Sequence, residues 1–495
     1  MKKQCYERKV FDPRRWGLPM EAVDNLADQL RCTWSRFQTC FKTKTHDSSK
    51  HAWLYLRGLL TIETKRNYAN IARRVIDPED DGQNLQQFMS DSPWSARPVF
   101  TQIQEEISQR PELEGGMLTL DESGDEKAGD QSAGASRQYL GRWGKVDLGQ
   151  VGVALGYHQA GVWMMVDAEL YLPEEWFDQA HAELRRRWHI PPERTFSTKL
   201  KLGLEGILRA KANGLPFRVV GCDSLYGRDS HFRAALDSES LLYMAQVPSN
   251  ACIYLEKPEV GIPEKPLGQR GRPPSRKQVL NGISPVEVRR LANDPGLGWQ
   301  KAKVRSTERG ELIYECAARM VWTLTDEGQV RQEWLFLHRE EDSAISYFLS
   351  NAPEDTKLET LALWRSSRYF VERIFQDSKS EIGWDELVAR KYRAWMHHTA
   401  LTALALWFIA ETKLNWAKEH GRDPELAREL EVEVLPNLSV ANVRELLQAV
   451  LPLRQLSPEE ATRLVVKHLF HRTCSTHSRL KAQYSDLWIS DPNET

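Results

Sequence analysis

Apolar residues recur every three or four positions over much of residues 1–110, which is the spacing of an amphipathic helix. The clearest stretch is 68–76. The polar segment 77–82 separates it from a second helical stretch that begins near Leu85. We therefore expect the first 110 residues to form several helices.

After Pro111 the pattern changes to short apolar runs of the length of a strand. Helical stretches are expected from Pro173, where acids occupy the first turn, and over 198–213, with Gly214 after the last turn. Strands are expected at 117–120, 146–155, 162–172, 217–222 and 241–247. Strands followed by an alternation of helix and strand predict a mixed α/β fold.

Residues 250–340 interrupt this alternation. Segment 258–274 is rich in Pro and Gly, and the runs 312–324 and 330–338 indicate a β-ribbon, so we interpret the region as an insertion. Helical periodicity is expected from Ser343 to the end, including one helix over 361–383. The longest apolar run, at 399–410, is too short to cross a bilayer and predicts a buried helix.

These patterns divide the chain into five regions. The predicted regions are a helical domain at 1–112, the first part of an α/β core at 113–250, a β-rich insertion at 251–340, the second part of the core at 341–415 and a helical C-terminal region at 416–495.

The composition is that of an ordinary globular protein, with 41% hydrophobic and 27% charged residues, which excludes collagen-like, low-complexity and wholly disordered chains. The start of the chain has no apolar stretch, and the seven cysteines are scattered, so we expect a reduced, cytoplasmic protein without a signal peptide. The net charge is −2, yet residues 1–75 hold 16 Lys and Arg against 7 Asp and Glu. This local surplus indicates either a face that binds nucleic-acid phosphates or a solvated basic surface.

Two aspartates share one sequence context. Asp121 and Asp223 each follow a short apolar run and precede a polar turn that contains Gly. Ligands of open α/β sheets bind at the carboxyl ends of the strands, so the two side chains indicate a shared site. Carboxylate oxygens are the ligands that Mg²⁺ prefers.

A third acid is expected from the predicted helix 361–383. Arg368, Glu372 and Lys379 are separated by four and seven residues, so a helix places them on one face. A carboxylate between two cations suits a metal and a phosphate together. The spacing alone favours the other interpretation, a salt-bridged surface helix.

With these residues in this order, the sequence resembles the bacterial insertion-sequence transposases of the DDE superfamily, which have a ribonuclease H-like core. The resemblance spans most of the chain and rests on the joint order of several motifs. These motifs are 120–124 (LDESG), 136–139 (SRQY), 144–146 (GKV), 150–153 (QVGV), 170–176 (LYLPEEW), 223–227 (DSLYG), 371–375 (VERIF), 379–383 (KSEIG) and 393–398 (RAWMHH).

The resemblance implies that Asp121, Asp223 and Glu372 are the three catalytic acids, which bind Mg²⁺ or Mn²⁺. Glu381 is the nearest rival for the third acid, but its register with the neighbouring cations is poorer. With two metal ions, such a site displaces one phosphate ester by another. The implied activity is that of a Mg²⁺-dependent endonuclease that cuts DNA and transfers the cut strand.

The resemblance also assigns DNA-binding roles. Arg368 and Lys379 match the arginine and lysine of the family signature, whereas the tyrosine position holds Arg365. The implied partners are double-stranded DNA, both element ends and target, and a second copy of the chain in the active complex, with no membrane. Two alternatives remain open: a nuclease that does not integrate, and a non-catalytic DNA-binding protein derived from a transposase.

Weaker signals lie outside these motifs. Arg270 and Arg272 lie in an Arg-Gly-Arg-Pro segment that resembles an AT-hook, so they are expected to bind DNA, although a solvated linker is the alternative. His397 and His398, beside the apolar run, are expected to pack or cap more often than to bind a metal. The tryptophans of the β-rich regions are expected to pack in the core, although one could stack on a flipped base; they are Trp143, Trp163, Trp299 and Trp322. The series His468, His471, Cys474 and His477 could suggest zinc, but this spacing spreads the side chains around a helix, so zinc binding is not expected.

Overall fold

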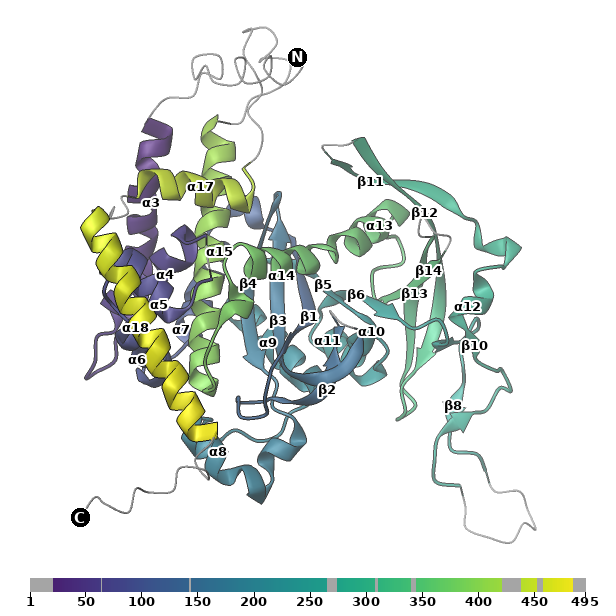
Figure 1. Ribbon diagram of the computed structural model, residues 1–495. Helices are drawn as coiled ribbons and strands as arrows, with labels where there is room; N and C mark the ends of the chain where they lie inside the picture. The colour runs from purple at the N-terminus through teal and green to yellow at the C-terminus, as the bar shows by residue number, and fades with distance from the viewer. Residues whose placement is uncertain are drawn as a thin grey trace, which may run out of the picture.

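The structure is a computed structural model of the 495-residue chain, and Figure 1 shows how its helices and strands are arranged. The residues that it describes are 21–63, 65–141, 144–264, 274–307, 310–339, 344–420, 438–451 and 457–483.

A group of helices formed by the N-terminal residues lies at one end of the molecule (Figure 1). Their apolar faces are buried against one another and against the long helix α15 (Tyr392–His420). The prediction of a helical N-terminal region is thus confirmed for the described residues. Its helices are α3 (Glu21–Phe37), η1 (Gln38–Phe41), α4 (Ser49–Thr61), α5 (Tyr68–Val75), α6 (Gln83–Asp91) and α7 (Arg97–Ser108), and the 3-10 turn η2 (Pro111–Leu113) leads into the sheet.

A ten-stranded sheet forms the centre, with strand order β11-β12-β13-β14-β6-β5-β1-β3-β2 and β4 paired with β3. Strands β1, β5 and β6 run parallel, and the other pairs are antiparallel. This confirms the predicted mixed α/β fold, as expected for a ribonuclease H-like core. The strands are β1 (Gly116–Glu126), β2 (Ser136–Leu140), β3 (Lys145–Gln159), β4 (Val162–Leu170), β5 (Phe217–Cys222), β6 (Leu242–Val247), β11 (Gln300–Thr307), β12 (Gly310–Leu324), β13 (Val330–Arg339) and β14 (Ile345–Ser350).

Helices cover both faces of the central strands. On one face, Gly203 of α9 (Lys199–Ala212) packs against Leu120 of β1. On the other face, Gly156 of β3 packs against Ile374 of α14 (Phe370–Ser380). Further helices are α8 (Ala182–Arg187), α10 (Ser224–Gly227), α11 (Ser230–Ser238) and α13 (Leu358–Ser367), with short 3-10 turns η4 (Glu174–Phe177), η5 (Gln179–His181) and η7 (Trp384–Glu386).

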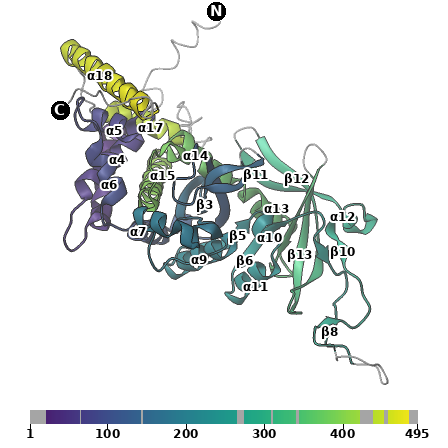
Figure 2. The ribbon, with the colours of Figure 1, turned by 60° about the horizontal axis from the view of Figure 1, so that its bottom comes forward.

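The β-ribbon predicted within 251–340 is present as β12 and β13, and it extends the central sheet through β14 and β6 (Figure 2). A buried ion pair helps to join it to the core, because Arg233 Nε of α11 lies 3.0 Å from Glu333 Oε1 of β13. The hydroxyl groups of Tyr243 and Thr323 also donate to this carboxylate. The small elements of this region are β7 (Cys252–Ile253), β8 (Val260–Gly261), β9 (Gln278–Val279), β10 (Val286–Glu287), α12 (Val288–Leu291) and η6 (Pro295–Leu297).

Three predictions of secondary structure are wrong. The single helix over 361–383 is two helices, α13 and α14, which are separated at Arg368 and Tyr369 by a turn of i→i+3 hydrogen bonds. Helical structure does not return at Ser343, because residues 345–350 form β14, which pairs with β13 on one side and with β6 on the other. The segment after Pro173 forms 3-10 turns before the short helix α8.

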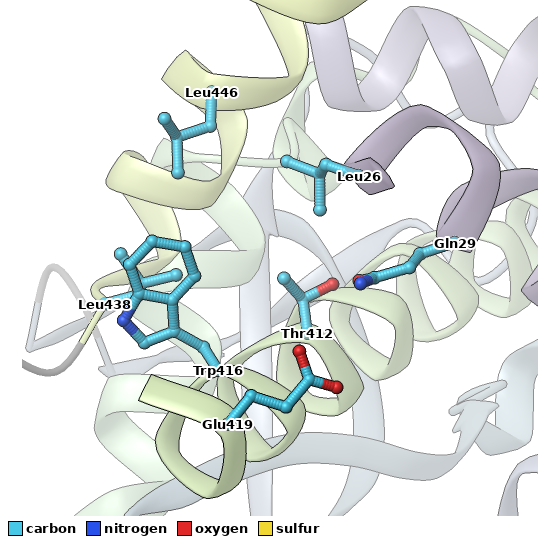
Figure 3. Close-up of a pocket in the computed structure, with 7 residues that line it drawn as sticks. All are labelled: Leu26, Gln29, Thr412, Trp416, Glu419, Leu438 and Leu446. Carbon is cyan, nitrogen blue, oxygen red and sulfur yellow. The ribbon is translucent and has the colours of Figure 1, made fainter. Parts of the chain in front are cut away.

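The C-terminal part is helical, as predicted, in its described residues. Helix α15 buries the apolar run 399–410, and α17 (Val440–Val450) packs against α3. Figure 3 shows Leu446 of α17 and Leu26 of α3 lining a small cavity with Trp416 of α15. The last helix is α18 (Pro458–Gln483). In the part of the chain that the structure describes, no helix is both long and apolar enough to cross a membrane.

Candidate active site

Asp121 and Asp223 lie side by side because their strands are parallel neighbours. The last residue pair in the register of β1 and β5 is Leu120 with Cys222, so each aspartate is the next residue of its strand. Asp223 directly follows β5 and caps α10, where its Oδ1 accepts a hydrogen bond from the Leu225 amide at 3.0 Å. Asp121 does not end its strand, contrary to the sequence prediction, because β1 continues to Glu126 through its pairing with β3.

The two carboxyl groups influence each other electrically. Burial raises the pKa of Asp121 most, the negative charge of Asp223 adds to the rise, and the amide of Glu122 and the guanidinium of Arg368 oppose it; the pKa that results is about 7. Two carboxylates that repel one another in a partly buried place favour a bound cation, because the cation removes the repulsion. The donor set is carboxylate oxygen, which suits a hard divalent ion such as Mg²⁺. The aspartate pair therefore fits such an ion.

Arg368 connects this pair to the third predicted acid. Its Nη1 lies 3.7 Å from Asp121 Oδ2, and its Nη2 lies 3.5 Å from Glu372 Oε1. Glu372 stands in the first turn of α14, and its side chain is 58% exposed. The structure brings Asp121 and Asp223 together, and the Arg368 guanidinium lies between Asp121 and Glu372. Among the described residues, no three His, Cys, Asp or Glu side chains lie close enough together to hold a metal ion.

Lys379 lies two helical turns further along α14, at roughly 10 Å along the axis from Glu372. Its Nζ lies 2.9 Å from Asp125 Oδ1 and 3.3 Å from the carbonyl oxygen of Gly124, both on β1. Since alternate residues of a strand share a face, Asp121 and Asp125 present their carboxyl groups on the side of β1 that α14 covers. Glu372 and Lys379 thus lie on the face of α14 that runs along β1. Arg368 lies on the same side, in the turn before α14.

The end of α14 is fixed to the N-terminal helices. Arg66, which precedes α5, donates from Nη2 to the carbonyl oxygen of Glu381 at 2.5 Å and from its backbone amide to Glu386 Oε2 at 2.6 Å. Gly383 ends this segment with φ +79°, where a Cβ atom would collide with Glu386 and Arg66. A cation at the C-terminus of a helix stabilises its exposed carbonyl groups.

The sequence profile of the DDE superfamily endonucleases matches residues 36–311, more than half of the chain. This chain belongs to the DDE superfamily endonucleases. The matched range includes Asp121 and Asp223 and ends before α14. A relative, the probable transposase for insertion sequence element IS701 of Microchaete diplosiphon, is 25% identical over 349 residues, which cover 70% of this chain and 78% of the relative.

Glu381 and Arg365 of this DDE endonuclease pair with side chains other than the aspartate pair. Glu381 Oε2 lies 2.8 Å from Arg444 Nη1 of α17, so this carboxylate is part of the contact between α14 and the C-terminal helices. Arg365 Nη1 donates to the Tyr314 hydroxyl at 3.0 Å, and its guanidinium also stacks over the Tyr314 ring. A tyrosine from β12 thus lies beside the position at which the family signature has its own.

The residues beside the site on the opposite face of β1 were not predicted from the sequence. Glu122 Oε2 lies 2.6 Å from Lys199 Nζ of α9, and the Tyr226 hydroxyl lies 3.5 Å from Glu122 Oε1. Asp125 was not predicted either. The available signal was the alternation along 121–126, which assigns Glu122 and Asp125 to opposite faces once the segment is recognised as a continuous strand.

Several of the weaker predictions concern packing. His397 and His398 are buried and hydrogen-bonded to backbone carbonyls, as predicted. Trp163 Nε1 donates to Asp377 at 2.8 Å, and Trp299 stacks under Arg339. Other predictions lie outside the described residues or side chains. These are Arg270, Arg272, Trp143, His468 and His471.

Proposed function

We propose that this protein is an insertion-sequence transposase that cuts DNA at the ends of its mobile element and joins those ends to target DNA. The proposal rests on the juxtaposition of Asp121 and Asp223 at neighbouring parallel strands, inside the range that matches the DDE endonucleases. The similarity to the probable transposase for insertion sequence element IS701 supports the finer assignment.

Asp121 and Asp223 would hold divalent metal ions, Mg²⁺ or Mn²⁺, together with Glu372. When bound, such ions activate a water or a DNA 3′-hydroxyl and stabilise the leaving oxygen of an in-line displacement at phosphorus. The Arg368 guanidinium lies between Asp121 and Glu372. From there it would bind a non-bridging phosphate oxygen, for which its planar donors are suited.

Lys379 would bind the neighbouring phosphate from its position beside Asp125. Both cations now pair with acids of the site, at 2.9 Å for Lys379 and 3.5 Å for the nearer acid of Arg368. Phosphate binding therefore exchanges one anionic partner for another, and the guanidinium and amine need little reorganisation. This favours electrostatic stabilisation of the charge that develops at phosphorus.

The remaining regions receive DNA-binding and assembly roles in this proposal. The basic N-terminal region would bind the element ends, because its surplus of cations recruits phosphate backbone. Arg270 and Arg272 would contact DNA as well. Since two ends are joined in one reaction, the active complex would contain at least two copies of the chain, and it would work where bacterial DNA lies, in the cytoplasm at the nucleoid.

A strand-transfer assay tests the proposal. The purified chain is incubated with duplex DNA that carries the inverted repeat flanking its coding region, supercoiled target plasmid and Mg²⁺. The expected result is cleavage at the repeat end and joined products. Cleavage without joining would instead identify a nuclease, and binding without cleavage would identify a DNA-binding protein.

A further inference from the structure

In the part of the chain that the structure describes, the edge of β1 beside the aspartate pair has no second strand partner. Strand β1 pairs with β5 only from Gly116 to Leu120, whereas its pairing with β3 continues to Glu126. Within the described residues, positions 121–126 therefore have a strand partner on one side only. Asp223, which follows β5, stands at the beginning of this open edge.

The two sides of this edge carry matching cations. On the side of α14, Arg368 pairs with Asp121. On the side of α9, Lys199 pairs with Glu122, the next residue of the strand, with 2.6 Å between Nζ and Oε2. The Lys199 and Glu122 side chains are 18% and 20% exposed, so the pair is accessible from the surface without being fully solvated.

Lys199 is held firmly in this place. Thr198 caps α9 by accepting a hydrogen bond from the Lys201 amide at 3.2 Å, which fixes the first turn. The Lys199 amine lies 5.3 Å from the centre of the Tyr171 ring, a cation–π distance. Glu122 is in turn near the buried Tyr226, three residues after Asp223. These contacts join Lys199 to both strands that carry the aspartate pair.

The chemistry of this arrangement suits a phosphate. Arg368, Lys379 and Lys199 each pair with an acid of β1. A DNA strand that lies along this edge brings phosphates to both of its sides, and Arg368 and Lys379 lie on one of these sides only. We propose that Lys199 binds a backbone phosphate of this strand, on the side of the aspartate pair opposite Arg368. The proposal rests on the proposed function.

The test compares two lysines of the same helix. Lys201 is 59% exposed and lies 3.9 Å from Glu205, so Lys201→Gln removes the same charge from α9 without touching the edge. Binding of the inverted-repeat duplex is measured by fluorescence anisotropy without Mg²⁺ over a range of salt concentrations. Losing one phosphate contact lowers the slope of log K against log salt by about 0.9.

Lys199→Gln is expected to reduce that slope by about 0.9, while Lys201→Gln and Lys199→Arg leave it unchanged. We also expect roughly three- to tenfold weaker binding for Lys199→Gln at moderate salt, since a charge-assisted hydrogen bond is lost. Equal slopes for Lys199→Gln and Lys201→Gln would overturn the proposal. This result does not depend on cleavage, so it is distinguishable from a failure of the proposed function.

Glu122→Gln provides a second test, which remains informative if Lys199→Gln does not fold. It releases Lys199 from its partner and is expected to tighten DNA binding. In the Lys199→Gln background the same change should tighten binding by a smaller factor, because no released amine is available. An equal gain in both backgrounds, or weaker binding by Glu122→Gln, would show that Lys199 does not contact the DNA.

Discussion

The close approach of α14 to the sheet depends on Gly156. A Cβ atom at this position would lie closer than 3.0 Å to Ile374 Cδ1, a separation that Cβ atoms in proteins essentially never show. It would also lie 3.0 Å from Thr119 Oγ1. Ile374 is fully buried and is two residues from Glu372, so Gly156→Ala should push α14, which carries Glu372, away from β3.

The expected cost follows from the packing. Forcing one extra carbon into a filled core costs about 1–3 kcal/mol. Alanine restricts the unfolded chain more than glycine does, which offsets about 0.4–1 kcal/mol of this cost. We therefore expect Gly156→Ala to lower the free energy of unfolding by about 1–2 kcal/mol. A displacement of about 1 Å at a catalytic group can cost on the order of a hundredfold in rate, so DNA cleavage should fall by one to two orders of magnitude.

A double-mutant cycle isolates this contact. Ile374→Val removes Cδ1, and the next atom, Cγ1, is 3.7 Å from the added Cβ. Alone, Ile374→Val should cost about 0.5–1.5 kcal/mol. Together, the two changes should be at least about 1 kcal/mol less destabilising than their sum, and cleavage should recover.

Urea denaturation of the four proteins measures the cycle, with Gly129→Ala as control, because nothing lies within 4 Å of a Cβ at Gly129. The control should change stability by less than about 0.5 kcal/mol. Strict additivity of Gly156→Ala and Ile374→Val would refute the assigned contact between α14 and β3.

Two further predictions concern buried charges. Burial lowers the pKa of His398 to about 4, below its ordinary 6.5, so the unfolded chain binds more protons than the folded one between these values. The free energy of unfolding should fall by up to about 3 kcal/mol as pH falls from 6.5 to 4. Denaturation of His398→Asn should show a correspondingly shallower pH dependence, and an unchanged pH dependence in this variant would contradict the prediction. Arg233→Met leaves the carboxylate of Glu333 without its 3.0 Å partner and should cost about 3–5 kcal/mol in urea denaturation, whereas a loss below about 1 kcal/mol would contradict a stabilising role for this ion pair.

The central strands and the aspartate pair could be predicted from the sequence because both depend on local pattern. Short apolar runs identified β5, β6, β12 and β13, and parallel neighbours must bring the residues that follow them together. The proximity of Arg368 and Glu372 followed from their spacing of four residues, even though Arg368 lies in the turn before α14.

The rest depended on contacts between distant segments. The continuation of β1 beyond Asp121 is driven by its pairing with β3, and the polar segment alone gives no apolar alternation. The pair of Glu122 and Lys199 requires α9 to pack on the sheet, 77 residues away in the sequence. Strand β14 was missed because its six residues lie between a segment without a clear pattern and a long helical region.

The most direct test of the acid assignment is DNA cleavage by Asp223→Asn with Mg²⁺ present. Asparagine keeps the size of the side chain and the acceptor that caps α10, while it removes the charge beside Asp121. We expect this variant to bind the inverted-repeat duplex as tightly as the unaltered protein and no longer to cut it. Cleavage at the unaltered rate would contradict the assignment.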